Sequence, residues 1–558
     1  MKERLRVILE QAVRSACSAG HLQPDGVPPS MILEIPKIAD HGDYSTNVAM
    51  IMAGAQRMPP QEIARIIIDH LQDPDQLISK TEIAGPGFIN FFISKDKWYE
   101  VLKAVHDQGI TYGSSNLGAG KRIQIEFVSA NPTGPLHVGH GRCAAVGDTL
   151  AEILKAVGYE VEKEYYVNDS GRQISTLGQS VFFRYCELLG KSRKFPPDFY
   201  QGDYINDLAR ILIDREGERL LNIDEEEAVE VCARFAASEI LSGIKEDLKA
   251  FGISFDRWFS EESLYKSGAV EAVIKDLESQ GIIYEREGAL WFRTQDFGDE
   301  KDRVVVRTNG VTTYFASDIA YHKDKFERGF DRIVDIWGAD HHGYIPRVWA
   351  SIEALGYEKE RCQIILVQLV NLLRGGKPVA MSTRAGEFVT LKEVIGEVGK
   401  DAARFLYLLR HYDSPLDFDM ELAKKESSEN PVYYVQYVHA RISSILRKAK
   451  ARGYKKICWQ PDFPKLIGQP EEIQLIKLMA RYPEIVAQSA LLMEPHRIPF
   501  YLKDLASAFH AYYHDRARHK IISDNAELSA ARLFLVSAIQ IVIRNGLRLI
   551  GVSAPQSM

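Results

Sequence analysis

Residues 122–167 restrict the possible folds of this chain more than any other stretch. The segment 122–129, RIQIEFVS, is rich in β-branched and aromatic residues and predicts a strand. A loop of turn formers at 130–136 leads into a helical pattern over 137–156, and YEVEKEYYV at 159–167 predicts a second strand. Strand, loop, helix and strand in this order make a βαβ unit, which requires a parallel sheet with helices packed on it.

Two histidines mark the start of the predicted helix. His137 and His140 stand three residues apart and therefore face the same side of the helix. A helix start offers free N–H groups and the positive end of the helix dipole, and in doubly wound sheets ligands bind at this carboxyl edge of the strands. Gly139 lets a flat ring approach the backbone. The pattern predicts a nucleotide with its phosphates at the helix start.

Two other interpretations of the histidine pair stay open at this point. A zinc pair on a helix usually has a wider spacing and a glutamate, and HVGH has neither. The six cysteines are scattered without a C-x-x-C pair, so neither a thiolate zinc site nor a disulfide framework is indicated, and we expect no protein-bound metal. Alone, H-x-G-H also fits two partly exposed histidines that bind nothing.

A second cationic stretch lies far along the chain. GKPVAMSTRAGEFVTL, from Gly376, combines Lys377 and Arg384 with small residues and a glycine. Such a loop can close on a polyphosphate and stabilise the charge that develops in a transition state. By itself, the same composition also fits a solvated surface loop.

The remaining sequence predicts three regions. With 558 residues and 46% apolar content, the chain is long enough for several packed domains. A small α+β unit precedes the loop YGSSNLGAGK, and from about Asp401 the pattern is nearly all helical. We expect a multidomain α/β protein with an N-terminal α+β domain (1–112), a Rossmann-like doubly wound parallel sheet domain (113–425) with a helical insertion around 185–290, and a C-terminal all-α helical bundle (426–558).

Charge and hydropathy indicate the surroundings of the protein. The net charge is −7, but residues 431–558 contain 18 Lys and Arg against 9 Asp and Glu, which leaves −16 for the remainder. A basic terminal segment favours a localised contact with a polyanion, although an uneven solvated surface would have the same composition. We find neither a signal peptide nor an apolar run of about 18 residues, and we expect a cytoplasmic protein without membrane contact.

The motifs and their context resemble class I aminoacyl-tRNA synthetases. H-x-G-H after a first strand, paired with a distant MSxR loop, is similar to the HIGH and KMSKS signatures of that class. Longer blocks narrow the resemblance to the arginyl-tRNA synthetase family, and they run essentially from end to end. These blocks are EFVSANPTGPLHVGHGR, YYVNDSGRQ, TYFASDIAYHKDK, WGADHHGYIPR, MSTRAGEFVTL, NPVYYVQYVHARI and RLIGVSAPQSM.

The resemblance implies a ligase reaction in two steps. L-arginine and ATP, the latter as its Mg2+ complex, form arginyl-adenylate and pyrophosphate. The arginyl group then passes to the 3′ end of tRNA(Arg). Enzymes of this kind act mainly by positioning and charge stabilisation. The family also implies a monomer.

The resemblance further implies an ATP site around the HIGH segment, which comprises Ala130, Asn131, Pro132, Thr133, Gly134, Pro135, Leu136, His137, Val138, Gly139 and His140. Within it, His137 and His140 would contact the phosphates, and Gly139 would admit the adenine. The remaining ATP contacts are expected from Gly338, Asp340, His341, Met381 and Ser382. Without the family, Asp340 and His341 would also fit a simple strand end.

The resemblance assigns the amino acid to carboxylates and hydroxyls. A guanidinium is a planar fork of donors, which carboxylates and a hydroxyl match best. Glu262, Tyr314 and Asp318 would bind it. Ser129 and Asn131 would hold the α-amino and carboxylate groups, with Glu126 in support. Without the family, Tyr314 and Asp318 would fit a core tyrosine and a helix-start carboxylate.

Both ends of the chain are expected to contact tRNA. The segment GPGFINFF resembles the family's contact to the tRNA corner, with Asn90 as the foremost candidate, although a plain strand and turn fits it too. Tyr434, Tyr437 and Arg441 in the helical tail would stack on or bond to unpaired bases. Tyrosines three apart on a helix also occur in cores, so we expect at most two of these three contacts.

The chain departs from the family at the second signature, which reads Ala380-Met381-Ser382-Thr383-Arg384. Both lysines of KMSKS are missing from their usual places. Some arginyl enzymes that lack the second lysine carry one just upstream of their first histidine, but Gly134 occupies that position here. Our hypothesis is that Arg384, helped by Lys377, serves the phosphates.

The residues alone leave other functions open. The rival enzymes are another H-x-G-H nucleotidyltransferase and a class I synthetase for a different amino acid; the carboxylate pair and the lack of a Cys-rich zinc signature disfavour cysteine and methionine. A noncatalytic RNA-binding paralogue is the rival of a different kind. The altered loop favours it, and the two intact histidines disfavour it.

Overall fold

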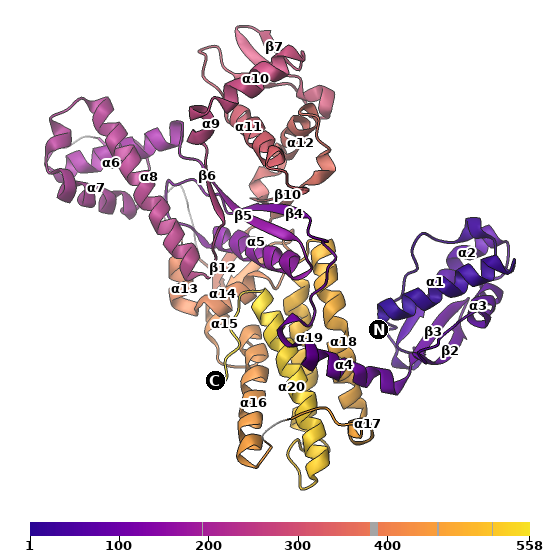
Figure 1. The fold of residues 1–558 in the computed structure, drawn as a ribbon. Coiled ribbons are helices and arrows are strands. Elements are labelled where there is room, and N and C mark those ends of the chain that lie inside the picture. The colour runs from indigo at the N-terminus through magenta and orange to yellow at the C-terminus, as the bar shows by residue number, and fades with distance from the viewer. Residues whose placement is uncertain (192–193, 380–388, 455–456, 516) are drawn as a thin grey trace. The chain divides into compact units, whose positions relative to one another are not determined.

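The computed structural model describes residues 1–191, 194–379, 389–454, 457–515 and 517–558 (Figure 1). The chain forms two compact units, each built from separate stretches of sequence. Unit 1 comprises Met1–Tyr112, Ser444–Tyr482 and Ser507–Val542, and unit 2 comprises Gly113–Ser443, Pro483–Ala506 and Ile543–Met558.

The N-terminal part of unit 1 is a small α+β fold. Its antiparallel sheet has the strand order β1-β3-β2. The turn Gly85-Pro86-Gly87 joins β2 to β3, so this stretch is a hairpin. The elements are α1 (Lys2–Ser18), β1 (Tyr44–Thr46), α2 (Val48–Gln56), α3 (Pro60–Asp69), β2 (Ile78–Ala84), β3 (Phe88–Ile93) and α4 (Lys95–Gln108).

The parallel sheet predicted from the βαβ pattern is confirmed in unit 2. Five strands lie in the order β11-β10-β4-β5-β6, and every neighbouring pair is parallel. The strands are β4 (Arg122–Phe127), β5 (Glu160–Val167), β6 (Arg257–Ser260), β10 (Arg332–Gly338) and β11 (Cys362–Val367). The chain runs outward from β4 in one direction and then returns to β10 on its other side. This reversal makes the β4–β10 boundary the topological switch point of the sheet.

The helix α5 (Val138–Ala156) follows β4 and packs closely against it. Its sequence is rich in alanine and glycine, and nearly all of its residues are buried. At Gly147 an added Cβ would lie 2.3 Å from the ring of Phe127 on β4. A glycine there lets the helix approach the strand, which fixes where the helix start, with its histidines, meets the edge of the sheet.

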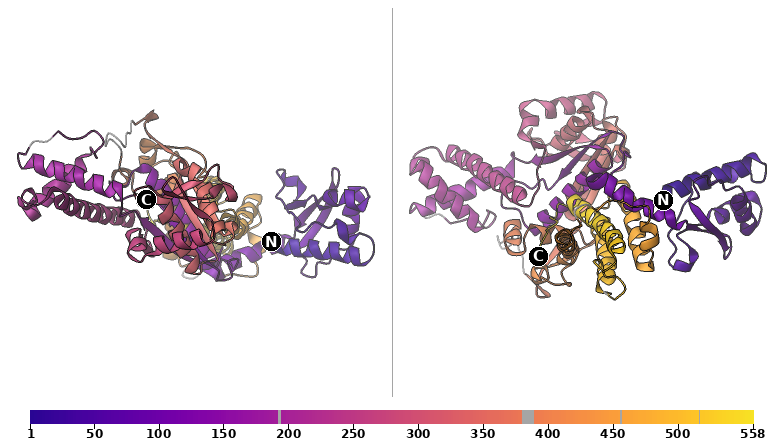
Figure 2. Two further views of the ribbon diagram at one scale, coloured as in Figure 1. Left: turned by 90° about the horizontal axis from the view of Figure 1, so that it is seen from above. Right: turned by 60° about the horizontal axis from the view of Figure 1, so that its bottom comes forward.

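The helices α6 (Arg172–Leu188), α7 (Asp203–Glu216) and α8 (Glu225–Ala250) pack together and extend from the sheet of unit 2 (Figures 1 and 2). They begin earlier than the helical insertion expected around 185–290. That range also contains β6, which belongs to the main sheet. The four residues RWFS are too short and too mixed in polarity to show a strand period.

Two smaller sheets complete unit 2. One has the order β7-β8-β9 and packs with α9–α12, and the other has the order β13-β12-β14. Their elements are β7 (Ile283–Arg286), β8 (Ala289–Phe292), β9 (Arg303–Val306), α9 (Glu262–Lys266), α10 (Ala269–Ser279), α11 (Tyr314–Glu327), α12 (Ile345–Ala354), β12 (Val370–Arg374), β13 (Lys377–Pro378), β14 (Leu416–Asp419), α13 (Leu391–Val398), α14 (Lys400–Tyr407) and α15 (Met420–Lys424).

The chain after Asp401 is mostly helical, as expected, apart from β14. The long helices are α16 (Pro431–Ala451), α18 (Pro470–Leu491), α19 (Arg497–His514) and α20 (Ala526–Leu549), with the short α17 (Phe463–Leu466) between the first two. Among the described residues, α20 alone is long and apolar enough to cross a membrane, but 61% of its most apolar window is buried. Burial of that extent is typical of a packed core helix.

Short 3-10 helices connect several elements. They are η1 (Pro24–Gly26), η2 (Ala39–His41), η3 (Gly109–Thr111), η4 (Arg219–Leu221), η5 (Thr294–Phe297), η6 (Ala339–Tyr344) and η7 (Lys359–Arg361). The one that matters for the site is η6, because it directly follows β10 at the switch point.

Candidate active site

A cavity of about 380 Å³ opens at the carboxyl edge of the parallel sheet in unit 2. Its walls come from the ends of β4, β5 and β10, the residue after β6, the first half of α11, and η6. The lining residues are Glu126, Val128, Ser129, Asn131, Tyr166, Asn168, Gln173, Glu261, Tyr314, Asp318, Tyr321, His322, Ile336, Trp337, Gly338, His341 and Tyr344. The cavity therefore contains the switch point, where open α/β sheets bind their ligands.

The turn that follows β4 is strained. Val128 and Ser129 have φ angles of +70° and +40°, which residues other than glycine rarely adopt. Polar contacts hold this conformation: the Ser129 hydroxyl donates to Glu126 Oε1 at 2.9 Å and accepts from the backbone N–H of Tyr166 at 3.1 Å. Next along the chain, Asn131 Nδ2 donates to Gln173 Oε1 at 2.7 Å. Such strain is concentrated at functional sites.

Two carboxylates face the cavity, one buried (Glu261) and one half-buried (Asp318). Glu261 is 1% exposed and accepts from the Ser317 hydroxyl at 2.7 Å, and burial raises its pKa. Asp318 accepts a hydrogen bond from the Tyr344 hydroxyl. Burial raises the pKa of Asp318 to about 6, although that hydrogen bond acts in the opposite direction. A pair of desolvated carboxylates creates a strong preference for a cation.

The structure places Glu261, and not the predicted Glu262, in this cavity. Glu262 is the first residue of α9, and its exposed side chain pairs with Lys266 one turn later at 2.8 Å. Its backbone N–H donates to Asp169. Because β6 ends at Ser260, the next residue still points toward the edge of the sheet, whereas the helix start turns the following side chain to solvent. Tyr314, at the start of α11, does line the cavity.

The two histidines form a reciprocal cap on α5. The backbone N–H of Gly139 donates to His137 Nδ1 at 3.1 Å, and the backbone N–H of His137 donates to His140 Nδ1 at 3.2 Å. Their rings stack with centroids 3.7 Å apart. An added Cβ at Gly139 would lie 3.0 Å from the His137 ring, so a glycine lets that ring rest over the first turn.

Burial keeps both imidazoles neutral. It lowers the pKa of His140 to about 3, with His137 adding to the effect. Burial also lowers the pKa of His137, while the negative charge of Asp340 acts in the opposite direction. Asp340, on η6 beyond β10, therefore lies close enough to the start of α5 to act on His137. Neutral rings can exchange their capping hydrogen bonds for contacts to a phosphate.

The predicted residues after β10 divide between the cavity and its rim. Gly338 and His341 line the cavity. The side chain of Asp340 is 78% exposed, and its Oδ2 lies 3.6 Å from His341 Nε2. An added Cβ at Gly338 would come within 2.5 Å of Asp340 Oδ1, so the glycine makes room for this carboxylate.

The segment after the second signature attaches directly to the HIGH segment. The backbone N–H of Leu391 donates to the Leu136 carbonyl at 2.7 Å, and that of Val138 donates to the Val389 carbonyl at 3.3 Å. Thr390 then caps α13. The predicted residues Met381, Ser382 and Arg384 lie outside the described residues. Lys377 is an exposed residue of β13.

The helical insertion supports the HIGH segment from the other side. The Tyr204 hydroxyl donates to the Thr133 carbonyl at 2.8 Å, and an added Cβ at Gly134 would lie 3.3 Å from that hydroxyl. Tyr204 therefore occupies the space next to the position where some family members carry a lysine. Gln173, on α6, reaches Asn131 in the same segment.

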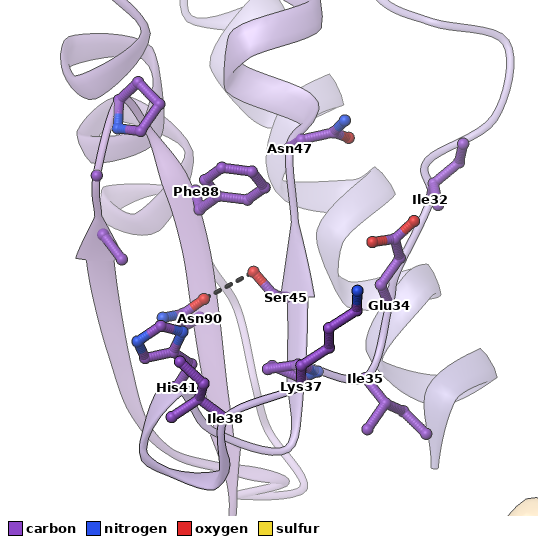
Figure 3. A pocket seen from close by; sticks show the side chains of 14 residues that line it. Ile32, Glu34, Ile35, Lys37, Ile38, His41, Ser45, Asn47, Phe88 and Asn90 are labelled. Atoms are coloured by element: carbon purple, nitrogen blue, oxygen red, sulfur yellow. Dashed lines mark hydrogen bonds between the residues drawn. The ribbon is translucent and has the colours of Figure 1, made fainter.

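The predicted tRNA-binding residues lie elsewhere. Asn90 lines a second cavity, of about 460 Å³, in the N-terminal part of unit 1 (Figure 3). Its side chain is 3% exposed, and Oδ1 accepts from the Ser45 hydroxyl at 2.7 Å. Phe88 borders the same cavity. On α16, Arg441 stacks over the ring of Tyr437 at 4.8 Å, and Tyr434 is half-buried.

Sequence reasoning missed several residues of the site. Tyr344 and Gln173 contact predicted residues and lie within the blocks WGADHHGYIPR and YYVNDSGRQ, but no role was assigned to them. Trp337 and Tyr166 end buried strands, and strand composition alone does not distinguish a cavity wall from a core. Glu261 could have been found, because its neighbour was already selected.

Family models and known proteins agree with this geometry. The model described as "tRNA synthetases class I (R), catalytic domain" matches residues 101–410, which include the whole parallel sheet. The chain is thus a class I aminoacyl-tRNA synthetase. The models described as "Arginyl tRNA synthetase N terminal domain" and "DALR anticodon binding domain" match residues 3–93 and 435–558.

Full-length relatives specify the family. The arginine–tRNA ligases of Desulfosudis oleivorans and Syntrophotalea carbinolica are 57% and 53% identical to this chain, and both alignments cover all of each chain. The chain belongs to the arginyl-tRNA synthetase family, as the sequence motifs predicted. The solved arginyl-tRNA synthetase of Thermus thermophilus shares the fold, with a TM-score of 0.77, 23% identity, and coverage of 99% of this chain and 100% of that one.

Proposed function

We propose that this chain is an arginine–tRNA ligase that activates L-arginine with ATP and transfers it to tRNA(Arg), with the cavity of unit 2 as its active site. One observation carries the assignment to this cavity: two carboxylates, the buried Glu261 and the half-buried Asp318, face the switch point of a class I sheet beside the histidine-capped start of α5. A cationic amino acid and a polyphosphate would then lie next to each other. That juxtaposition is what adenylate formation requires.

The amino acid is read by charge and by donor geometry. The guanidinium of arginine pairs with Glu261 and Asp318, with Tyr314 as the hydroxyl partner; Glu261 takes the role first given to Glu262. Ser129 and Asn131 hold the α-amino and carboxylate groups at the end of β4. A neutral amino acid would leave buried carboxylates unpaired, which is costly enough to reject it without an editing step.

ATP lies along the HIGH segment. His137 and His140 leave their capping bonds and donate to the phosphates, Gly139 accommodates the adenine, and Gly338, Asp340 and His341 hold the ribose. Arg384, helped by Lys377, supplies cationic charge from the second signature, and Met381 and Ser382 are further ATP-binding residues. Thus the protein contributes positioning and charge rather than a covalent intermediate.

Mg2+ enters as part of the ATP substrate complex, and no resident metal is needed. Within the part of the chain that the structure describes, one group of side chains, His322, Asp335 and Cys362, has a spacing that could hold an ion. However, Asp335 is already bonded to Lys325 at 2.7 Å and to His322 at 3.1 Å. An ammonium at this distance occupies the charge that a metal would otherwise neutralise.

Two surfaces bind the tRNA. Asn90 and its cavity contact the tRNA corner, and at most two of Tyr434, Tyr437 and Arg441 on α16 contact the anticodon. Their support is the buried amide that lines a pocket with an aromatic ring beside it, and the excess of positive charge in 431–558. We further propose that the protein acts as a cytoplasmic monomer without membrane contact.

Arginine-dependent ATP–pyrophosphate exchange tests this function. Exchange is measured with each amino acid, with and without tRNA(Arg), and aminoacylation of the tRNA is measured in parallel. We expect exchange with arginine alone among the amino acids, and it should be strongest when tRNA is present. Absence of exchange with any amino acid, even with tRNA, would instead identify a noncatalytic RNA-binding protein, and exchange with another amino acid would refute the assigned pocket.

A further inference from the structure

Lys325 lies beneath the floor of the cavity, with no exposed surface. It belongs to α11, the helix that also carries Tyr314 and Asp318. Its Nζ lies 2.6 Å from Glu126 Oε2 on β4 and 2.7 Å from Asp335 Oδ1 on β10. Because β4 and β10 flank the switch point, this one ammonium connects the helix to both strands at the place where the cavity opens.

The contacts continue from Lys325 to the surface of the cavity. Glu126 uses its second oxygen, Oε1, to accept from the Ser129 hydroxyl, and that hydroxyl in turn accepts from the N–H of Tyr166. These are the contacts that hold the strained turn at Val128 and Ser129. An unbroken series of polar contacts therefore runs from the buried ion cluster to the turn that faces the substrate.

Lys325 also divides the carboxylates around the cavity into two classes. Burial disfavours its charged form, but the carboxylates of Asp335 and Glu126 overcome this effect and raise the pKa of Lys325. Among the residues that the structure describes, no Lys or Arg lies within ion-pair distance of Glu261 or Asp318. The two inner carboxylates share the ammonium of Lys325, and the two outer ones are left for a cationic ligand.

We infer that Lys325 is a positioning residue for the amino-acid site: by bonding to both Glu126 and Asp335 it fixes the Val128–Ser129 turn, and it leaves the charge of Glu261 and Asp318 for the substrate. Lys325 touches no substrate and acts through Glu126 and Ser129. The inference rests on the proposed function of the cavity as the arginine site. Positioning at this distance matters because a small displacement of a binding group costs a large factor in rate.

The test removes the charge of Lys325 and then removes one of the carboxylates left behind. Lys325→Met keeps the length of the side chain without its charge. In the double variant Lys325→Met/Glu126→Gln, the new carboxamide oxygen still accepts from Ser129 while one unpaired charge is gone. KM for arginine, KM for ATP and kcat are measured in tRNA-supported pyrophosphate exchange with the full chain, together with the melting temperature.

We expect Lys325→Met to raise KM for arginine by about tenfold or more while KM for ATP changes much less, and the double variant to recover most of the loss. The inference would be overturned if KM for arginine and KM for ATP rose equally and in step with a fall in the melting temperature. It would also be overturned if the double variant showed no recovery. Should Lys325→Met not fold, Glu126→Gln alone must raise KM for arginine selectively, because with Lys325 in place one carboxamide oxygen cannot accept from both Ser129 and Lys325; an unchanged value overturns the inference. Failure of the unaltered chain to exchange with arginine would refute the proposed function instead.

Discussion

At the scale of single residues, the adjacent glutamates at 261 and 262 separate what a sequence can predict from what it cannot. Family resemblance selected Glu262 at this point of the chain, but the structure places its neighbour Glu261 in the cavity. The choice between them depends on where β6 ends and α9 begins. A boundary of this kind depends on tertiary packing and is the least predictable feature of an element. In contrast, Ser129 and Asn131 follow a well-marked strand, and both line the cavity.

The first residue-scale prediction compares these two glutamates directly. Glu261→Gln should lower kcat/KM for arginine by about ten- to a hundredfold, because a hydrogen bond to a charged group contributes roughly 1.5–3 kcal/mol. Glu262→Gln is the matched control, since that side chain is exposed and pairs only with Lys266 among the described residues; its kcat/KM should stay within about twofold of the parent. Steady-state exchange at varied arginine concentration measures both. The reverse order of effects would return the role to Glu262.

The second residue-scale prediction concerns pH. The pKa of Asp318 is about 6 in the unliganded protein, with Tyr344, His322, Glu261 and Glu126 as its titratable neighbours. Only the ionised carboxylate pairs with a guanidinium, so kcat/KM for arginine should fall as the pH drops below about 6 and level off above it. Tyr344→Phe removes a hydrogen bond that lowers this pKa, so the inflection should move to higher pH. An inflection that stays in place in this variant would show that another group is titrating.

At the scale of elements, the βαβ unit was predictable because its pattern is local. A β-branched strand, a loop of turn formers and an alanine-rich helix lie consecutively, and β4, α5 and β5 match them closely. β6 was missed because its four residues pair with β5, a strand more than eighty residues earlier, and carry no alternation of their own. The contact between the HIGH segment and the segment after the second signature could not be predicted either, since it joins residues 136–138 to residues 389–391, far apart in sequence.

This contact gives a prediction about the second signature. Arg384→Ala should lower the activation rate by more than about tenfold, the size expected for losing one charge-stabilising contact.

Thr390→Ala acts at the anchor instead: it removes the cap of α13 and loosens the backbone link to the HIGH segment. We expect Thr390→Ala to cost about 1 kcal/mol, which corresponds to a several-fold rise in KM for ATP. The cationic group of the second signature is still present in this variant. Single-turnover formation of the adenylate separates the two, and a near-normal rate in Arg384→Ala would exclude that arginine.

At the scale of the whole molecule, composition predicted the distribution of charge but not the division into units. The segment 431–558 is basic, while the rest of the chain is acidic. Yet parts of its helices belong to different units, because α16, α18, α19 and α20 each cross a unit boundary. Within unit 1, the residue after η3 connects to this helical region: the Tyr112 hydroxyl donates to the Met479 carbonyl at 2.9 Å. A contact between residues so far apart in sequence leaves no local pattern.

The two proposed tRNA surfaces should respond differently to salt. Asn90 is uncharged, so Asn90→Ala should raise KM for tRNA by a factor of about ten, roughly the contribution of one buried base contact, without altering how KM depends on salt. Arg441→Ala should reduce the slope of log KM against log salt by about 0.7–0.9, because one fewer phosphate is neutralised. Aminoacylation at several salt concentrations measures both variants. The control is KM for arginine at saturating tRNA, which should stay unchanged. If Arg441→Ala leaves the slope intact, this arginine, which stacks on Tyr437, serves the helix rather than the RNA.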